Sequence, residues 1–122
     1  MPLVLSVGQC SADDARIARM LVAMGITLER AYDGADALVK IAGRTYDLVL
    51  VNRVFDADGT SGVEFIGAAR REKGMPPLML VSDYADAQAA AVANGAAPGF
   101  GKSQLDMAES LELIRSAIQR VG

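Results

Sequence analysis

The sequence predicts an α/β fold in which five strands and five helices alternate along the chain, (βα)5, and build a doubly wound, parallel five-stranded sheet. Short apolar runs recur along the chain and are nearly continuous, which is typical of strands buried on both faces of a parallel sheet. The segments between them carry apolar residues at helical spacing. Alternating strands and helices imply right-handed crossovers, so that helices cover both faces of the sheet in a three-layer sandwich.

Apolar runs indicate three of the strands directly, and weaker patterns indicate the other two. The last expected strand contains Pro98 and two glycines. Because proline cannot donate a hydrogen bond to a neighbouring strand, we expect this strand at an edge of the sheet. The expected strands are residues 3–7, 26–31, 48–51, 78–81 and 97–101.

Helical spacing of apolar residues indicates four helices, and an alanine-rich stretch at 85–94 indicates another. Each set of spaced residues would form one apolar stripe that faces the sheet. In chain order, the stripes are Ile17, Met20, Leu21 and Met24; Ala37, Leu38 and Ile41; Val63, Ile66 and Ala69; and Met107, Leu111, Ile114, Ile118 and Val121.

Three helix starts carry the capping-box pattern, in which a serine stands three residues before a carboxylate. In such a box, each of the two side chains hydrogen-bonds the backbone N–H of the other residue. The three expected boxes are Ser11 with Asp14, Ser61 with Glu64, and Ser103 with Asp106.

Length and composition restrict the class of protein. The 122 residues are enough for a single domain, which we expect over residues 1–122. Fifteen acidic and twelve basic residues give a net charge of −3, which argues against a nucleic-acid partner. The chain has no histidine and one cysteine, Cys10. These two counts exclude a Ser-His-Asp triad, a Cys-His dyad, a His/Cys zinc site and an internal disulfide.

Two further absences concern the compartment. No apolar run at the amino terminus is long enough for a signal-peptide core, and none reaches the roughly twenty residues of a membrane span. We therefore expect a soluble, cytoplasmic protein with no membrane partner.

Residues that follow the strands are the candidates for a site, because ligands of open parallel sheets bind beyond the carboxyl ends of the strands. They are Gly8, Gln9 and Cys10 after the first strand, Asn52 and Arg53 after the third, Ser82 and Asp83 after the fourth, and Lys102 after the fifth.

Four segments in a fixed order give the chain a family resemblance. "YDLVLV" precedes the central loop, "DGTSGVEFI" opens a helix, "PPLMLVS" forms a strand with its following serine, and "NGAAPGFGK" leads to a lysine. With these segments the chain resembles the receiver domains of two-component response regulators, the CheY-like family, over essentially its whole length. The resemblance implies a flavodoxin-like sheet with the strand order 2-1-3-4-5.

The resemblance also implies a phosphorylation site. Two acidic residues after the first strand and an aspartate after the third would hold Mg²⁺, and this aspartate would take a phosphoryl group. A Ser/Thr and a lysine would contact the phosphoryl oxygens, and Ser82 and Lys102 match them. Gly8, Gln9 and Asn52, however, stand where the three carboxylates are expected. Because Mg²⁺ needs carboxylate oxygens and an amide is a poor nucleophile, we expect no metal, no cofactor and no acyl phosphate.

The residue that reports phosphorylation in the family differs as well. An aromatic side chain three residues before the lysine is expected to swing inward, and this position is Gly99. Phe100 is its neighbour, and because side chains alternate along a strand, it should point to the opposite face. The loop that follows Asn52 is also longer than usual for the family.

The sequence thus predicts an atypical, or pseudo-, receiver domain. We expect it to be no enzyme and to act through phosphorylation-independent contacts with a protein partner, such as a histidine kinase, an output domain or another signalling protein. A homodimer through the fourth helix, fifth strand and fifth helix is a further expectation, since receiver domains commonly use this face.

Two alternative functions remain at this point. In the first, a displaced aspartate in the long loop, Asp56 or Asp58, accepts the phosphoryl group. In the second, the chain is a flavodoxin-like domain that binds a small anion in the emptied pocket, beside Gly8 and a free Lys102.

Overall fold

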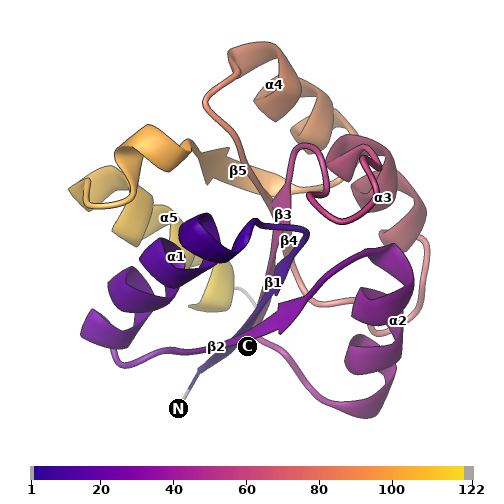
Figure 1. Cartoon of the computed structure of the whole chain (residues 1–122), viewed down its shortest axis with the longest axis horizontal. Coiled ribbons are helices and arrows are strands. Elements are labelled where there is room, and N and C mark those ends of the chain that lie inside the picture. Colours follow the sequence, from indigo (N-terminus) through magenta and orange to yellow (C-terminus); the bar gives the residue numbers. More distant parts are fainter. Residues whose placement is uncertain (1, 120–122) are drawn as a thin grey trace.

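Strands and helices alternate along the chain as the apolar pattern predicts (Figure 1). The computed structural model describes residues 2–119. The elements are β1 (Leu3–Val7), α1 (Ser11–Ala23), β2 (Thr27–Ala31), α2 (Gly34–Gly43), β3 (Leu48–Asn52), α3 (Gly62–Ala69), β4 (Leu78–Val81), α4 (Ala85–Ala93), β5 (Ala97–Phe100), a short 3-10 helix η1 (Lys102–Gln104) and α5 (Ala108–Gln119). None of the helices in this part of the chain is long and apolar enough to cross a membrane.

All strand pairs of the sheet are parallel, and the strand order β2-β1-β3-β4-β5 confirms the predicted topology. The central strand β3 is buried along its whole length. The strand that contains Pro98 lies at the edge, as expected, and its pairing with β4 is irregular between Met79 and Val81. The carboxyl ends of β1, β3, β4 and β5 therefore meet at one edge of the sheet.

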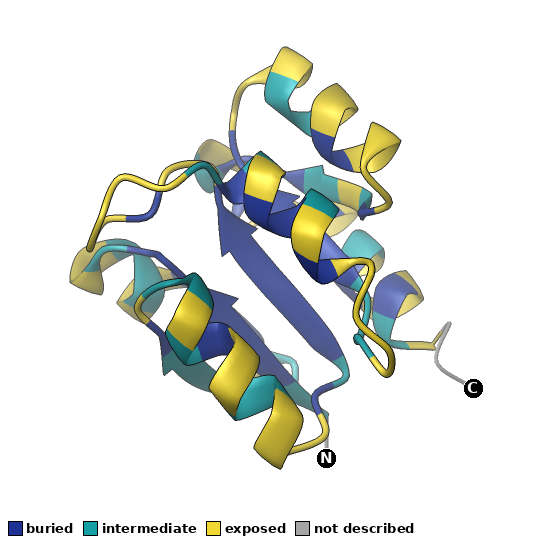
Figure 2. Ribbon diagram, turned by 90° about the vertical axis from the view of Figure 1, so that its right-hand side faces the viewer, coloured by how far each residue is buried: buried dark blue, intermediate teal, exposed yellow. Residues whose placement is uncertain are grey.

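Helices cover both faces of the sheet, so the molecule has three layers (Figures 1 and 2). Alternate residues of each strand face opposite sides, which separates the core in two. On one side, Leu5, Val49 and Val51 pack with residues of α2, α3 and α4; on the other, Val4 and Leu50 pack with residues of α1 and α5. Burial of each such side chain is worth about 1.5–3 kcal/mol.

The structure confirms one of the three predicted helix starts. Ser61 caps α3, and its Oγ accepts the backbone N–H of Glu64 at 3.3 Å. Ser11 is instead the first residue of α1, because the Sγ of Cys10 accepts the backbone N–H of Asp13 and makes Cys10 the N-cap. Ser103 lies within η1 and bonds to Asp83, so it caps no α-helix.

The apolar stripe of the last helix is shorter than predicted. Ile114 is buried, and Leu111 and Ile118 pack against the same cluster. Met107 precedes α5 and is 49% exposed, because η1 and the turn after it use the residues that were expected to start the helix. Val121 lies outside the described residues.

Candidate functional site

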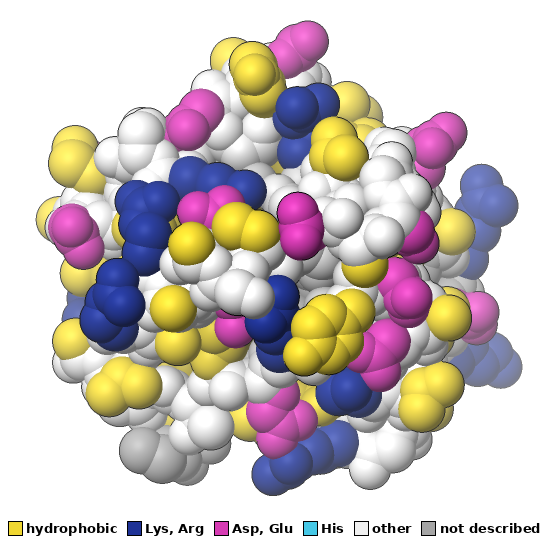
Figure 3. Space-filling model, in the orientation of Figure 1, with side chains coloured by type: hydrophobic (Ala, Val, Ile, Leu, Met, Phe, Trp, Pro, Cys, Tyr) yellow, Lys and Arg dark blue, Asp and Glu magenta, His cyan; other side chains and the backbone are white. Residues whose placement is uncertain are grey.

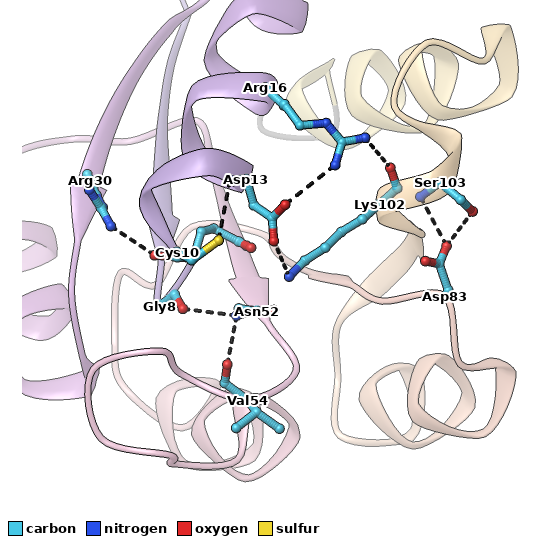
Figure 4. Close-up of polar contacts among 11 residues, drawn as sticks. Gly8, Cys10, Asp13, Arg16, Arg30, Asn52, Val54, Asp83, Lys102 and Ser103 are labelled. Atoms are coloured by element: carbon cyan, nitrogen blue, oxygen red, sulfur yellow. Dashed lines mark hydrogen bonds and ion pairs between the residues drawn. The ribbon is translucent and has the colours of Figure 1, made fainter.

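The predicted site residues lie at the edge of the sheet where four strands end. Asn52, Ser82 and Lys102 line one pocket of about 360 Å³, together with Arg53, Val54, Val81, Asp83 and Tyr84. Gly8 and Gln9 follow β1 at the same edge but do not line this pocket. Three of the five predicted residues thus share a cavity, and Figure 4 shows the contacts of two of them, Asn52 and Lys102.

Asn52 ends β3 with its side chain buried and turned toward the neighbouring backbone. Its Nδ2 donates to the carbonyl oxygens of Gly8, at 2.9 Å, and of Val54, at 2.7 Å (Figure 4). A carboxylate at this position would place a negative oxygen against two carbonyl oxygens. The local backbone is therefore suited to an amide donor rather than to an aspartate.

Phe55 fills the space beside Gly8. The ring is 1% exposed and packs edge-on against Phe65, with 5.6 Å between the ring centroids. A Cβ built on Gly8 would lie 2.3 Å from Cδ1 of Phe55, and Gly8 has a φ of +77°, which L side chains rarely adopt. An acidic side chain cannot stand at position 8 without displacing Phe55 and changing the backbone.

The long loop after β3 holds Phe55 in this position. The Phe55 N–H donates to the carbonyl of Thr60, and the Gly59 N–H donates to the carbonyl of Phe55. The Asp56 N–H donates to the carbonyl of Gly8, which ties the loop to the end of β1. Phe55 is the site residue that sequence reasoning missed. The available signal was an aromatic residue in an otherwise polar loop.

The two aspartates of this loop are exposed, and neither lines the pocket. The Oδ1 of Asp58 accepts the backbone N–H of Thr60 at 3.0 Å, and this hydrogen bond lowers the pKa of Asp58. Asp58 therefore stabilises a turn of the loop.

Gln9 replaces the second expected acid, and its side chain is buried. Neither Nε2 nor Oε1 has a hydrogen-bond partner among the described residues. The backbone carbonyl oxygen of Gln9 accepts a hydrogen bond from Nη2 of Arg30 at 3.0 Å. A buried amide is neutral, so this position adds no charge that could attract a cation.

Lys102 is engaged in an ion pair. Its Nζ lies 2.7 Å from Oδ2 of Asp13, in the first turn of α1 (Figure 4). Lys102 is therefore not the free cation that the small-anion alternative assumes. Periodicity in the sequence does not show that the start of α1 lies beside the end of β5. The hydrogen bond from Lys102, partly opposed by burial, lowers the pKa of Asp13 below its ordinary value of 3.8. The pair stabilises the fold above that pH, and this contribution is lost as the pH falls through the lowered pKa.

Ser82 follows β4, and its Oγ accepts the backbone N–H of Tyr84 at 3.2 Å. The Oδ1 of the next residue, Asp83, accepts hydrogen bonds from the backbone N–H of Ser103, at 3.2 Å, and from its Oγ, at 2.7 Å. These contacts fix the connection between β4 and α4 and join it to η1.

Gln88 of α4 covers the position of the missing aromatic residue. Its Nε2 lies within hydrogen-bond distance of the carbonyl oxygens of Leu80, Ser82 and Phe100, and its Oε1 accepts the N–H of Gly99. A Cβ on Gly99 would lie 2.1 Å from the carbonyl oxygen of Leu80. Phe100 is buried on the side of α1 and α5, so the prediction that it faces away is confirmed.

The residues of this edge do not fit the Mg²⁺ site that the family resemblance implies. Amide and carbonyl groups occupy the positions after β1 and β3, and the Phe55 ring occupies the space beside Gly8. Among residues 2–119, no group of three or more Asp, Glu, Cys or His side chains is placed to hold a metal ion.

The surface around the edge is mixed in charge. On the face shown in Figure 3, acidic and basic side chains are interspersed, and several basic groups lie next to one another at the left. Two guanidinium groups stack on exposed tyrosines, Arg53 on Tyr84 at 4.5 Å and Arg30 on Tyr32 at 4.6 Å. Stacked Tyr and Arg side chains are common in protein interfaces.

A larger cavity, of about 810 Å³, lies at the opposite edge of the sheet, where Tyr46, Leu78 and Ala97 begin or precede their strands. Its lining includes Arg44 and Arg70 but none of the predicted site residues. None of the residues that the resemblance assigns to a phosphorylation site therefore lines this cavity.

Substitution of glycines tests the packing of Phe55. We expect Gly8→Ala to lower the free energy of unfolding by about 2–4 kcal/mol, because it adds both backbone strain and overlap with the ring. Gly25→Ala, with a similar φ but open space around it, should cost about 1 kcal/mol. Gly43→Ala, in α2 without either problem, should be neutral or slightly stabilising. Urea denaturation measures all three, and equal costs for Gly8→Ala and Gly25→Ala would show that Phe55 does not fill this space.

Substitution of Gln88 tests the attachment of α4. Gln88→Met keeps the length of the side chain but leaves the Gly99 N–H and its neighbouring carbonyls without their partner, so we expect a loss of about 2–3 kcal/mol. Gln104→Met removes one hydrogen bond, to the Gly101 N–H, and should cost about 1 kcal/mol. Hydrogen exchange should show faster opening of α4 only in the first variant. Unchanged exchange there would contradict the assignment.

Comparisons with known proteins agree with this fold. No protein-family model matches the chain, and no curated protein matches it in sequence. Among solved structures, the receiver domain of a Francisella response regulator is similar over 100% of both chains, with a TM-score of 0.84 and 19% identity. A response regulator from Thermotoga maritima is similar over 98% of each chain, with a TM-score of 0.80 and 22% identity.

A third similarity is to part of a longer protein. NtrX from Brucella abortus has 18% identity and a TM-score of 0.74, and the match covers 97% of this chain and 28% of the NtrX chain. With the strand order and the pattern of crossovers, these likenesses support one conclusion: the chain has the CheY-like fold of response-regulator receiver domains.

Proposed function

We propose that this chain is a receiver-type signalling module that contacts protein partners without being phosphorylated at the edge of its sheet. It performs no catalytic step of its own in this proposal. The observation that carries it is the packing of Phe55 against Gly8, together with the amide of Asn52 between two carbonyl oxygens. The Phe55 ring occupies the space that an acidic side chain at position 8 would need. The Asn52 amide donates hydrogen bonds at a position where a carboxylate would present negative oxygens.

The proposed partner is a protein of the same signalling class, such as a histidine kinase or an output domain. The net charge of −3 and the interspersed acidic side chains of the face in Figure 3 support a protein rather than a nucleic acid. The face formed by α4, β5 and α5 is the proposed docking surface, including for a homodimer. Its exposed residues include Tyr84, Val92 and Pro98, and Gln88 fixes α4 to the strands below.

Both alternatives have less support. Asp56 and Asp58 are exposed and outside the pocket that Lys102 lines, and Asp58 already accepts a backbone hydrogen bond. A small-anion site beside Gly8 and Lys102 lacks its two premises, since Phe55 fills the first position and Asp13 pairs with the second.

Treatment with a small phosphodonor tests the proposed function. We expect the intact mass of the wild-type chain to stay unchanged after incubation with acetyl phosphate and Mg²⁺, because no carboxylate stands beside a cation site. A known phosphorylatable receiver domain under the same conditions is the positive control. An added phosphoryl group on Asp56 or Asp58 would support the displaced acceptor and overturn the proposal.

Restoring one carboxylate should not restore the chemistry. We expect Asn52→Asp to remain unlabelled by the same donor and to be less stable by about 2–3 kcal/mol, because its carboxylate would face the carbonyl oxygens of Gly8 and Val54. Asn94→Asp removes an exposed amide donor and should cost less than about 1 kcal/mol. Mg²⁺-dependent labelling of Asn52→Asp would show that acidic ligands lie elsewhere than positions 8 and 9.

A further inference from the structure

We propose that the carboxylate of Asp13 is a built-in ligand of Lys102, and that the subsite it occupies accepts a small carboxylate or phosphate anion once this side chain is removed. The inference rests on the proposed function, because it explains how the lysine at the end of β5 is neutralised in a module that receives no phosphoryl group.

Both oxygens of the Asp13 carboxylate are engaged by cations. Oδ2 lies 2.7 Å from Nζ of Lys102, and Oδ1 lies 3.4 Å from Nη1 of Arg16 (Figure 4). The side chains of Lys102 and Asp13 are only 29% and 20% exposed. This partial burial makes the pair stronger than a fully solvated one.

The backbone around Lys102 is held from two sides. Nη2 of Arg16 donates to the carbonyl oxygen of Lys102 at 3.0 Å, which fixes the start of η1 to α1. On the other side, Asp83 accepts two hydrogen bonds from Ser103. The Arg16 guanidinium on α1 and the Asp83 carboxylate after β4 thus hold the β5–α5 connection between them (Figure 4).

The charge of the pocket explains why the ligand is an anion. Its lining carries two cations, Lys102 and Arg53, and one carboxylate, Asp83, which is already bonded to Ser103. Asp13 reaches Lys102 from α1 and does not itself line the pocket. Besides Lys102, the titratable or charged groups that contact Asp13 are Cys10 and Arg16. Removal of the Asp13 carboxylate would leave Nζ of Lys102 and Nη1 of Arg16 without the anion that both contact.

Chemical rescue tests this subsite. We expect Asp13→Ala to lower the melting temperature by about 3–5 °C. Sodium formate, whose anion has the size of the deleted carboxylate, should restore part of this loss relative to sodium chloride at equal ionic strength. The wild-type protein, where Asp13 fills the subsite, should show no such difference between the two salts.

Two further variants act as controls. Asp13→Ala combined with Lys102→Met should lose the response to formate, because the cation of the subsite is gone. Asp36→Ala breaks an ion pair of similar geometry, to Lys40 at 2.8 Å on α2, and should show no rescue. If Asp13→Ala does not fold, Asp13→Ser, whose side chain is too short to fill the subsite, with amide NMR of residues 102 and 103 during a phosphate titration is the equivalent measurement.

The outcomes separate this inference from the proposed function. Equal responses of Asp13→Ala to formate and chloride, or rescue that persists in the Lys102→Met double variant, would overturn the subsite. Phosphodonor labelling of the wild-type chain would overturn the proposed function and leave the rescue result to stand by itself.

Discussion

The arrangement of the whole edge depends on the packing of Phe55 against Gly8. Burial of the ring is worth about 1.5–3 kcal/mol, and its edge-on contact with Phe65 adds about 0.5–1.5 kcal/mol. A hydrated cation and an aromatic ring cannot share the same space, because the first needs charged oxygens and the second needs apolar neighbours. The long loop after β3 therefore has the role of placing an apolar group in the core of the fold rather than a ligand on a metal.

This packing determines which polar groups can stand beside it. The carbonyl oxygens of Gly8 and Val54 need a donor, and Nδ2 of Asn52 supplies one. Lys102 needs an anion, and Asp13 supplies it. Asn52 and Lys102 thus find their partners within the chain, whereas the buried side chain of Gln9 has no hydrogen-bond partner among the described residues.

The fold could be predicted from the sequence because its signals are local and repeated. Near-continuous apolar runs indicate the buried strands, and Pro98 indicates the edge strand. Residues on the site, such as Asn52 and Lys102, could be placed because they directly follow those strands. Phe55 and Asp13 could not be placed, because their roles depend on how a loop and a helix approach the edge, and periodicity has no information on that approach. The failed caps have a similar reason: a serine three residues before a carboxylate fits a capping box, but Cys10 caps α1 one residue earlier through the Asp13 N–H, and Asp83 accepts the Ser103 N–H.

The contacts of α4 extend the argument from the site to the surface. In a switch driven by phosphorylation, the connection after β4 must have two arrangements of similar free energy. Here one glutamine, Gln88, contacts the backbone of β4, of β5 and of the connection itself, and Gly99 offers no side chain that could move between two positions. A second arrangement would have to break these hydrogen bonds together, in a partly buried environment where unpaired groups are costly. In the proposed phosphorylation-independent module, a partner that recognises the α4 surface would therefore meet it in the arrangement that these hydrogen bonds hold.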